Sequence, residues 1–274
     1  MSDVRLLKLG GSLLTDKGAV ERPREETIRR LAEELAVECR REPGSLIVGH
    51  GSGSFGHAEA KRRGLEGGRS TAVPPAAVAA VQAAARRLHL LVMDGLLAAG
   101  APALSFPPSA CLLAGDASVG SWDPGPLRAA LKLGALPVVY GDVVLDSSGM
   151  ARICSTEEAL GALARSLRAD GCRIVSAFWL GETDGVLDAR GLRIPEIAAD
   201  GGEVPESVGG ARGTDVTGGM AHRVSSALAM AAEGTPSWIG DGRAPGVVAD
   251  ALRGAPPGGT WIRTIPGSRP APEA

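Results

Sequence analysis

The 274-residue chain has few aromatic residues and no block of like charge. Aromatics make up 3% of the residues, so the core must be built mainly from Ala, Leu, Val and Ile, while 39 Gly and 19 Pro supply turns. The 29 basic and 31 acidic residues leave a net charge of -2, which gives no support to a nucleic acid or an anionic membrane as partner. We therefore expect a small-molecule partner.

Signals for export or membrane insertion are also missing. The four cysteines, at positions 39, 111, 154 and 172, form no C-x-x-C pair, and the N-terminus lacks the apolar core of a signal peptide. Reduced thiols in a cytoplasm are the simplest account. Asp94 interrupts the longest apolar stretch, around 88–104, which falls short of a membrane span. The sequence predicts a soluble, cytoplasmic protein.

Three common nucleotide-binding patterns are absent or incomplete. Residues 51–56 fit G-x-G-x-x-G, yet no Asp or Glu lies between Gly67 and Met93, where a dinucleotide-binding Rossmann fold needs an acidic residue for the ribose. Neither the P-loop pattern nor the catalytic-loop pattern of protein kinases occurs. These absences remove the main support for all three families.

The chain does contain three glycine-rich turns, each where an apolar strand is expected to give way to a helix. They are Lys8-Leu9-Gly10-Gly11-Ser12, Gly51-Ser52-Gly53-Ser54-Phe55-Gly56-His57 and Thr214-Asp215-Val216-Thr217-Gly218-Gly219-Met220. Glycine lets the backbone approach a ligand closely, and a helix N-terminus offers unpaired N–H groups. With Lys8, Lys17 and His57 nearby, the turns predict a site for several phosphoryl groups, as phosphoryl transfer requires.

Strand and helix patterns alternate along the whole chain. Strands are expected at 4–9, 46–48, 103–106, 173–178 and 237–239, with two further runs on either side of Gly141-Asp142 within 136–145. Helices are expected around 28–35, 76–99, 157–167 and 220–232, and the segments 246–252 and 260–264 complete the alternation. This order predicts a mostly parallel sheet with helices on both faces and ligands at the carboxyl ends of its strands.

These segments resemble the amino-acid-kinase superfamily and, within it, the isopentenyl phosphate kinases. The resemblance rests on 8–12 with Asp16-Lys17, on 50–57, and on the segments 141–144, 183–186 and 215–220, in the family's order. The histidine of the Gly-Ser-Phe-Gly-His turn is the most discriminating element, because amino-acid-binding members lack it. Residues 106–109 and Gly115-Asp116 look more like the isopentenyl phosphate group than like the similar fosfomycin kinases.

The resemblance implies a three-layer α/β/α sandwich in two lobes. Residues 1–150 would bind the phosphoryl acceptor, residues 151–265 would bind the nucleotide, and 266–274 would form a loose tail. It also implies transfer of the γ-phosphoryl group of ATP, with Mg²⁺, to a phosphate monoester, and a homodimer. General chemistry agrees, because a phosphate oxygen is already a nucleophile and catalysis then depends on positioning and charge neutralisation.

The resemblance also assigns roles to single residues. It implies no protein ligand for the metal. The catalytic residues would be Lys8, Lys17, His57, Glu157 and Arg223. The acceptor phosphate would be bound by Gly51, Ser52, Gly53 and His57. The nucleotide would be bound by Gly10, Gly11, Ser12, Lys17, Asp184, Gly218, Gly219, Met220 and Arg223.

Structural alternatives exist for several of these residues. His57 could simply cap a helix, and Gly218-Gly219 could be a turn without a ligand. We expect His50 to support its turn rather than touch substrate. His89 and His222 fit ordinary helix-surface positions.

Two positions depart from the family pattern. Glu157, within Ser155-Thr156-Glu157-Glu158, is the nearest substitute for an aspartate that organises the catalytic lysines. Arg223 stands where a lysine normally reaches the nucleotide phosphates, and a planar guanidinium is not equivalent to a compact ammonium. Two other functions therefore stay open: a kinase for another small phosphate or phosphonate such as fosfomycin, and a catalytically weak nucleotide-binding regulatory protein.

Overall fold

The computed structural model describes residues 3–16, 18–65, 70–115, 119–120, 122–199 and 219–264. The chain divides into two compact units, residues 1–174 and 175–274. The strand β6 (Ala151–Cys154) and the helix α7 (Thr156–Ala169) belong to the first unit. The structural boundary thus lies later than position 150, and the division of the chain into an acceptor lobe and a nucleotide lobe stays a prediction.

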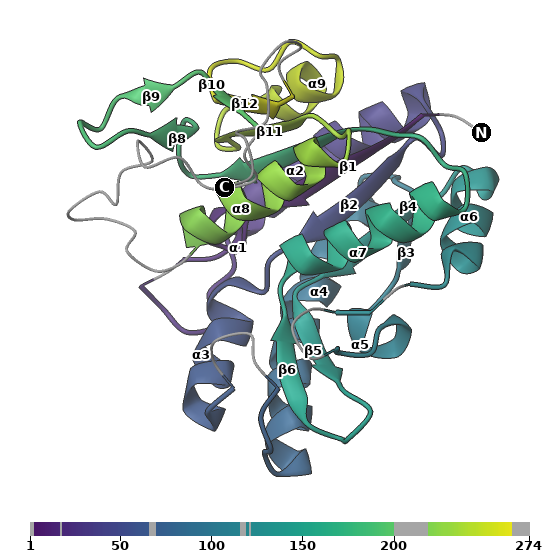
Figure 1. Ribbon diagram of the computed structural model, residues 1–274, viewed down its shortest axis with the longest axis vertical. Coiled ribbons are helices and arrows are strands. Elements are labelled where there is room, and N and C mark those ends of the chain that lie inside the picture. The colour runs from purple at the N-terminus through teal and green to yellow at the C-terminus, as the bar shows by residue number, and fades with distance from the viewer. Residues whose placement is uncertain are drawn as a thin grey trace, which may run out of the picture. The chain divides into compact units, whose positions relative to one another are not determined.

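The first unit alternates strands with helices (Figure 1). Its other strands are β1 (Val4–Leu9), β2 (Leu46–His50), β3 (Ala103–Ser105), β4 (Leu136–Tyr140) and β5 (Asp142–Leu145). Its other helices are α1 (Gly11–Leu14), α2 (Glu25–Arg41), α3 (Gly53–Arg63), α4 (Pro75–Ala98), α5 (Pro108–Cys111) and α6 (Pro124–Leu133). Strands β1, β2, β4 and β3 lie side by side in that order and are all parallel.

The helix α2 illustrates how the sequence pattern determines which residues of this unit form a helix and which of them are buried. Ile28, Leu31 and Leu35 recur at helical spacing and are all buried. Glu25 lies in the first turn and Arg41 in the last, where each charge is favoured by the helix dipole. The helix expected around 28–35 is therefore confirmed and extends beyond both ends of that apolar stripe.

The helix α4 follows the expected range closely. It has Pro75 at its start, where the missing N–H costs nothing, and Gly100 follows its end with a φ of 81°. By length and apolar composition α4 qualifies as a candidate membrane span, although the sequence analysis predicts none. Only 44% of that apolar window is buried, yet α4 contacts α2, α3 and β3 as the core helix of a globular protein does.

Successive residues of β2 face opposite helix layers. A Cβ at Gly49 would lie 2.6 Å from Thr156 Cγ2 and 2.9 Å from Leu160 Cδ1, so α7 packs directly on this strand. The side chain of His50 points to the other face, where it bonds His89 of α4. Helices therefore cover both faces of the parallel strands, which confirms the expected α/β sandwich class.

The strand β5 departs from the expected pattern. It does not join the parallel strands but pairs antiparallel with β6, so that Asp142 lies opposite Cys154. The hairpin packs against α3 and α4 through a small apolar cluster. That cluster contains the buried residues Ala60, Leu65, Val81, Val143 and Ala151.

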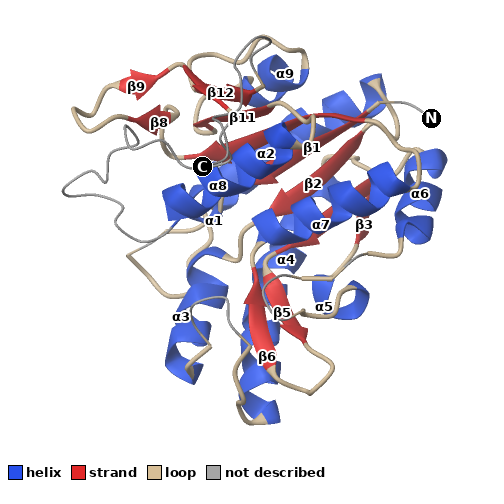
Figure 2. Cartoon of the chain, in the orientation of Figure 1, coloured by secondary structure: helices blue, strands red, loops and turns tan. Residues whose placement is uncertain are grey.

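The second unit has its own strands and helices (Figure 2). They are β7 (Ile174–Gly181), β8 (Val186–Leu187), β9 (Arg193–Ile194), β10 (Glu196–Ala198), α8 (Gly219–Ala232), β11 (Ser237–Asp241), α9 (Val247–Leu252) and β12 (Thr260–Arg263). Strand β7 is parallel to β11, which is antiparallel to β12, which is parallel to β10. Trp179 and Trp238 are fully buried here.

Candidate active site

The first two glycine turns of the sequence lie against each other, backbone to backbone. A Cβ at Gly11 would lie 2.5 Å from the backbone nitrogen of Gly53, and a Cβ at Gly51 would lie 2.7 Å from the nitrogen of Gly11. Gly53 also has a φ of 52°, which disfavours any other residue. Both turns open into helices, α1 after β1 and α3 after β2, as the sequence predicts. The fold therefore brings two helix N-termini to one place.

Thr15 links the two turns and was not singled out from the sequence. Its hydroxyl donates to the carbonyl of Gly11 at 2.8 Å and accepts from the amide of Ser54 at 2.9 Å. The side chain is fully buried. Its position four residues after Gly11 is the signal that could have found it, because a threonine hydroxyl reaches the carbonyl one helical turn back.

The start of the second turn is fixed by three further hydrogen bonds. The carbonyl of His50 accepts from the Thr156 hydroxyl at 2.7 Å and from the Gly141 amide at 3.0 Å. The amide of Gly51 donates to the carbonyl of Leu9 at 3.0 Å. The end of β2 is thus tied to β1, to the residue between β4 and β5, and to the first turn of α7.

Lys8 and Glu157 form a buried ion pair at this end of the strands. Lys8 is 5% exposed on β1, and its Nζ bonds Oε1 of Glu157, which is 7% exposed in the first turn of α7. A buried charge requires such a partner. Glu157 is therefore the partner that the buried charge of Lys8 needs.

The neighbouring Glu158 has a different task. Its side chain accepts from the amide of Ser155 at 2.9 Å, while Ser155 Oγ accepts from the amide of Glu158 at 3.1 Å. This reciprocal pair is a capping box that starts α7. It leaves Glu157, not Glu158, directed at Lys8.

His57 lies on α3, one turn after the second glycine turn. Its ring reaches solvent, and no hydrogen-bond partner for it occurs among the described residues. Enough protein surrounds the ring that desolvation, with the nearby charge of Lys8, lowers the pKa of His57 below its ordinary 6.5, while Glu157 opposes the shift. His57 is therefore a neutral imidazole beside the Lys8–Glu157 pair, with its ring nitrogens available to a ligand.

His89 is not the surface residue that the sequence analysis expects. It is 5% exposed, and its Nδ1 lies 2.9 Å from Nε2 of His50, which is fully buried. Nε2 of His89 lies 2.7 Å from the hydroxyl of Ser105, and the ring of Tyr140 stacks on His89 at a centroid distance of 4.1 Å. The helical spacing from Ala85 to His89 and Val92, all buried, is the signal that places it on the inner face of α4.

Both of these histidines are held in the neutral form. Burial lowers the pKa of His50 to about 4 and that of His89 to about 3. The charge of Lys8 adds to the shift at His50, and His50 adds to the shift at His89. His50 supports its turn, as expected, through a contact of 3.1 Å between its Nδ1 and the carbonyl oxygen of Gly51.

The second unit places Asp184 and Arg223 near the end of β7. Asp184 accepts from the amide of Gly259 at 2.8 Å and from Arg193 at 2.9 Å. The guanidinium of Arg223 lies against the last residue of β7, because a Cβ at Gly181 would be 2.7 Å from its Nη1. The buried Nε of Arg223 has no hydrogen-bond partner in the described part of the chain.

The third glycine turn is described only from Gly219, which begins α8 and is followed by Met220. Gly218 and Lys17 lie outside the described residues. His222 is exposed on α8, as expected. The proposed roles of all these residues stay predictions.

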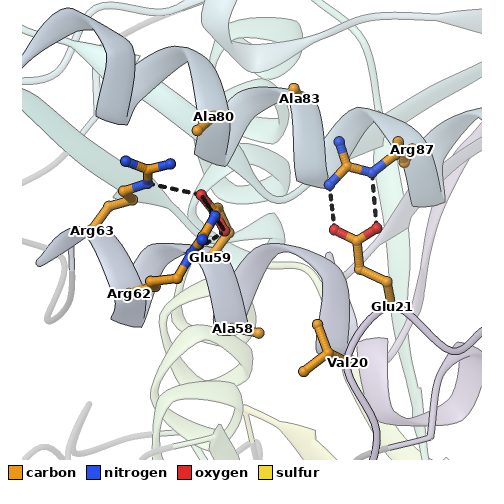
Figure 3. A pocket seen from close by; sticks show the side chains of 9 residues that line it. All are labelled: Val20, Glu21, Ala58, Glu59, Arg62, Arg63, Ala80, Ala83 and Arg87. Atoms are coloured by element: carbon orange, nitrogen blue, oxygen red, sulfur yellow. Dashed lines mark hydrogen bonds and ion pairs between the residues drawn. The ribbon is translucent and has the colours of Figure 1, made fainter.

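A cavity of about 520 Å³ lies between α3 and α4, and none of the glycine-turn residues lines it (Figure 3). Its arginines are already paired: Arg87 bonds Glu21, and both Arg62 and Arg63 bond Glu59. Figure 3 shows Arg62 and Arg63 turned toward Glu59 and Arg87 turned toward Glu21, with the three alanines divided between the two helices. We therefore place the candidate active site at the glycine turns and not in this cavity.

The site geometry and the order of the motifs agree with one family. The family model described as "Amino acid kinase family" matches residues 3–241. The chain belongs to the amino acid kinase family. Within the family, it resembles the isopentenyl phosphate kinases over nearly its whole length.

Two relatives and two solved structures illustrate this similarity. Isopentenyl phosphate kinase of Methanothermobacter thermautotrophicus is 34% identical, across 94% of this chain and 98% of its own length. Isopentenyl phosphate kinase of Haloferax volcanii is 36% identical, across 89% of this chain and 97% of its own length. The structure of an isopentenyl phosphate kinase substrate complex superposes with a TM-score of 0.74 at 25% identity, over 95% of this chain and all of its own. A second isopentenyl phosphate kinase structure superposes with a TM-score of 0.72 at 30% identity, over 94% of this chain and all of its own.

Proposed function

We propose that this amino acid kinase family member transfers the γ-phosphoryl group of ATP to a small phosphate monoester, with isopentenyl phosphate as the acceptor. The observation that carries the proposal is the contact between the turns at Gly11 and Gly51, beside the buried Lys8–Glu157 pair and the open ring of His57. The choice of isopentenyl phosphate as acceptor rests on relatives named isopentenyl phosphate kinase, which are similar over nearly the whole chain.

The chemistry needs two anions held in line and their charge neutralised. Lys8 supplies a positive charge at the end of β1, and Glu157 fixes where its ammonium lies. The amides of Ser52 and Gly53 have no acceptor among the described residues and are positioned to bind the acceptor phosphate. His57, neutral at pH 7, adds a hydrogen bond to the same phosphate. By resemblance to the family, Lys17 would add a second positive charge beside the phosphates.

The apolar cluster beside α3 favours an acceptor with a hydrocarbon tail. Ala60 lies one turn after His57 on α3, and it packs with Val81, Val143 and Ala151. Partly buried Val73, Val78 and Ile153 pack against the same cluster. A short branched alkyl chain attached to a phosphate at His57 would meet the partly buried members of this cluster, whereas a small polar phosphonate would gain little from them. The cluster thus supports isopentenyl phosphate over fosfomycin.

ATP enters this proposal as the second substrate, with Mg²⁺ carried on its phosphates. The described residues contain no group of three or more His, Cys, Asp or Glu side chains that could hold a metal ion. Mg²⁺ does not require such a group, because it commonly keeps its waters and binds substrate phosphates rather than a protein cage. When bound, the ion neutralises charge on the β- and γ-phosphates. We assign no protein ligand to it.

The test is a product assay with purified protein, Mg²⁺-ATP and a panel of short alkyl phosphates that includes isopentenyl phosphate, with fosfomycin as a separate acceptor. We expect conversion of isopentenyl phosphate to the diphosphate at the highest kcat/KM of the panel. Slow ATP hydrolysis without any phosphorylated acceptor would overturn the kinase proposal. ATP binding without turnover would favour the regulatory alternative.

We further propose a cytoplasmic homodimer acting in isoprenoid biosynthesis. All four cysteines are free, as expected in a reducing compartment.

Leu90 and Leu97 of α4 are each 54% exposed, and Leu104 of the edge strand β3 is 42% exposed. A second copy covering these leucines would explain them. Light scattering of wild-type protein and of Leu97→Lys measures the oligomeric state in solution. A monomeric wild type would contradict the proposed homodimer.

A further inference from the structure

A line of four polar groups crosses the first unit from the surface to the second glycine turn. It begins at the hydroxyl of Ser105, which is exposed on β3, and continues through His89 and His50. It ends at the carbonyl oxygen of Gly51. The successive contacts measure 2.7, 2.9 and 3.1 Å, all within hydrogen-bonding distance.

The chemistry of the last group sets the direction of every bond in the line. A carbonyl oxygen only accepts, so Nδ1 of His50 must carry its proton. Burial keeps both rings neutral, which leaves Nε2 of His50 as an acceptor from Nδ1 of His89. Nε2 of His89 then accepts from the hydroxyl of Ser105. Each ring nitrogen thus has one fixed role.

Packing leaves the rings little freedom to adopt another arrangement. The ring of Tyr140 stacks on both imidazoles, with interplanar angles of 13° to His50 and 22° to His89. His50 is fully buried and His89 is 5% exposed. A rotated ring would leave a buried nitrogen without a partner, which is costly.

The fixed carbonyl determines where the next amide points. The Gly51 carbonyl and the Ser52 N–H belong to one trans peptide and therefore point in opposite directions. With the carbonyl turned toward His50, the nitrogen of Ser52 lies on the side of Gly141, where a Cβ would be 3.6 Å from it and 3.4 Å from Thr156 Oγ1. Thr156 and Glu157 both lie in the first turn of α7, the helix that contributes the carboxylate of the buried ion pair.

Glycine lowers the cost of the other orientation. Flipping the peptide after Gly51 changes ψ of Gly51, where no Cβ opposes the change, and φ of Ser52, which is -76° here and would become positive. The cost of a flip therefore falls on Ser52 alone, and the bond from His50 adds to it. A flip would aim a carbonyl oxygen at the acceptor phosphate in place of an N–H. We propose that Ser105, His89 and His50 are positioning residues that hold this peptide in the phosphate-binding orientation, an inference that rests on the proposed kinase function only for the identity of the anion.

The kinetic test uses variants at the exposed end of the line, where folding is least affected. Ser105→Ala removes the terminal donor, and we expect the KM for isopentenyl phosphate to rise about 3- to 10-fold, the scale of one hydrogen bond, while the KM for ATP stays unchanged. Ser105→Thr keeps the hydroxyl and should restore the wild-type value. Ser147→Ala, at an exposed serine in the β5–β6 turn, is the matched control.

His89→Phe keeps a ring against Tyr140 but removes both bonds, and it should raise the acceptor KM by about 10-fold or more. An unchanged acceptor KM in Ser105→Ala, or a rise shared equally by ATP, would overturn the proposal. So would a Ser105→Thr variant that behaves like Ser105→Ala.

A second measurement does not depend on catalysis. In protein with ¹⁵N-labelled histidine, two of the four histidines should be neutral with the proton on Nδ1, and His50→Asn and His89→Phe should each remove one of these signals. Inorganic phosphate should shift the amide signals of Ser52 and Gly53 at lower concentration in wild type than in Ser105→Ala. Protons on Nε2, or equal phosphate titrations, would overturn the proposal even in an active enzyme. If the expected tautomers are found in a protein without kinase activity, only the proposed function fails.

Discussion

The glycine turns of the first unit and the glycine that begins α8 have similar sequences but different surroundings. Gly11, Gly51 and Gly53 lie against backbone atoms that leave no room for a Cβ. A Cβ at Gly219 would meet no atom within 4 Å among the described residues. The first pair of turns is shaped by contact with protein, whereas the described residues make no such contact at the start of α8. Similar glycine motifs can therefore differ in how closely protein packs against them.

The largest effect should come from the charge beside the packed turns. Lys8→Met is expected to lower kcat about 10³-fold, because it removes a cation from the moving phosphoryl group. It should also lower the free energy of unfolding by about 3 kcal/mol, since Glu157 would stay buried without its partner. Adding Glu157→Gln should restore much of the stability but none of the activity. Full activity in Lys8→Met would remove Lys8 from the site. Steady-state kinetics and urea unfolding measure both quantities.

One substitution made in both regions tests the comparison directly. Gly11→Ala should lower the free energy of unfolding by about 3 kcal/mol, because its Cβ would lie 2.5 Å from the nitrogen of Gly53. Gly219→Ala should stay within about 0.5 kcal/mol of wild type, since alanine suits a helix start with open space. Equal melting temperatures for the two variants would show that contact does not distinguish the regions.

His57 tests whether the first unit binds the acceptor. His57→Ala is expected to lower acceptor turnover about 10²-fold while the KM for ATP stays unchanged. Because the ring is exposed, its removal should leave the melting temperature nearly unchanged. His57→Gln keeps a donor and should recover part of the rate. A loss of ATP affinity with normal acceptor use would instead place His57 on the nucleotide side or in a purely structural role.

The two buried histidines predict a loss of stability in mild acid. Each has an ordinary pKa of 6.5 when unfolded, and the folded values are about 4 for His50 and about 3 for His89. The unfolded chain therefore binds protons first, so the free energy of unfolding falls as the pH drops below about 6.5. His89→Phe should remove roughly 2 kcal/mol of the change between pH 7 and pH 5, as measured by urea unfolding at both values. An unchanged pH dependence in this variant would contradict the folded-state pKa of His89.

The smallest effect concerns Glu157 and Arg223, which depart from the family pattern in different units. Glu157→Asp and Arg223→Lys should each lower activity several-fold, and the double variant should lose less than the sum of the two penalties in free energy. This coupling would show that the two regions act on one cluster of phosphates. Strictly additive losses would show that both residues matter independently, and unchanged rates would assign both to structural roles.

Local patterns predicted much of the fold but not the contacts between segments. The strand at 4–9 and the helix at 76–99 follow from apolar spacing, and the structure has them at Val4–Leu9 and Pro75–Ala98. The antiparallel pairing of β5 with β6 could not be predicted, because alternation does not say which neighbour a strand takes. For the same reason, the parallel order of β1, β2, β4 and β3 needed the structure.

The candidate site shows the same division. Lys8 interrupts an apolar strand, which indicates that its charge needs a partner, and Glu157, named from the family pattern, is that partner. The contact of His50 with His89 joins residues 39 positions apart, which no local pattern reports. The capping box of Ser155 and Glu158 is readable from S-x-x-E spacing, and it explains why only the first of the two glutamates faces Lys8.

The contact between Gly11 and Gly53 has a consequence for changing the enzyme by design. Neither Gly11 nor Gly53 can accept a side chain, and neither turn can shift without carrying the other along, so the backbone would set the spacing of the two anions in the proposed site. Variants that alter these glycines would therefore be poor starting points for new acceptors. Randomising the partly buried positions Val73, Val78 and Ile153 instead leaves both turns intact, so a change in the acceptor's tail can be selected without rebuilding the proposed phosphate site.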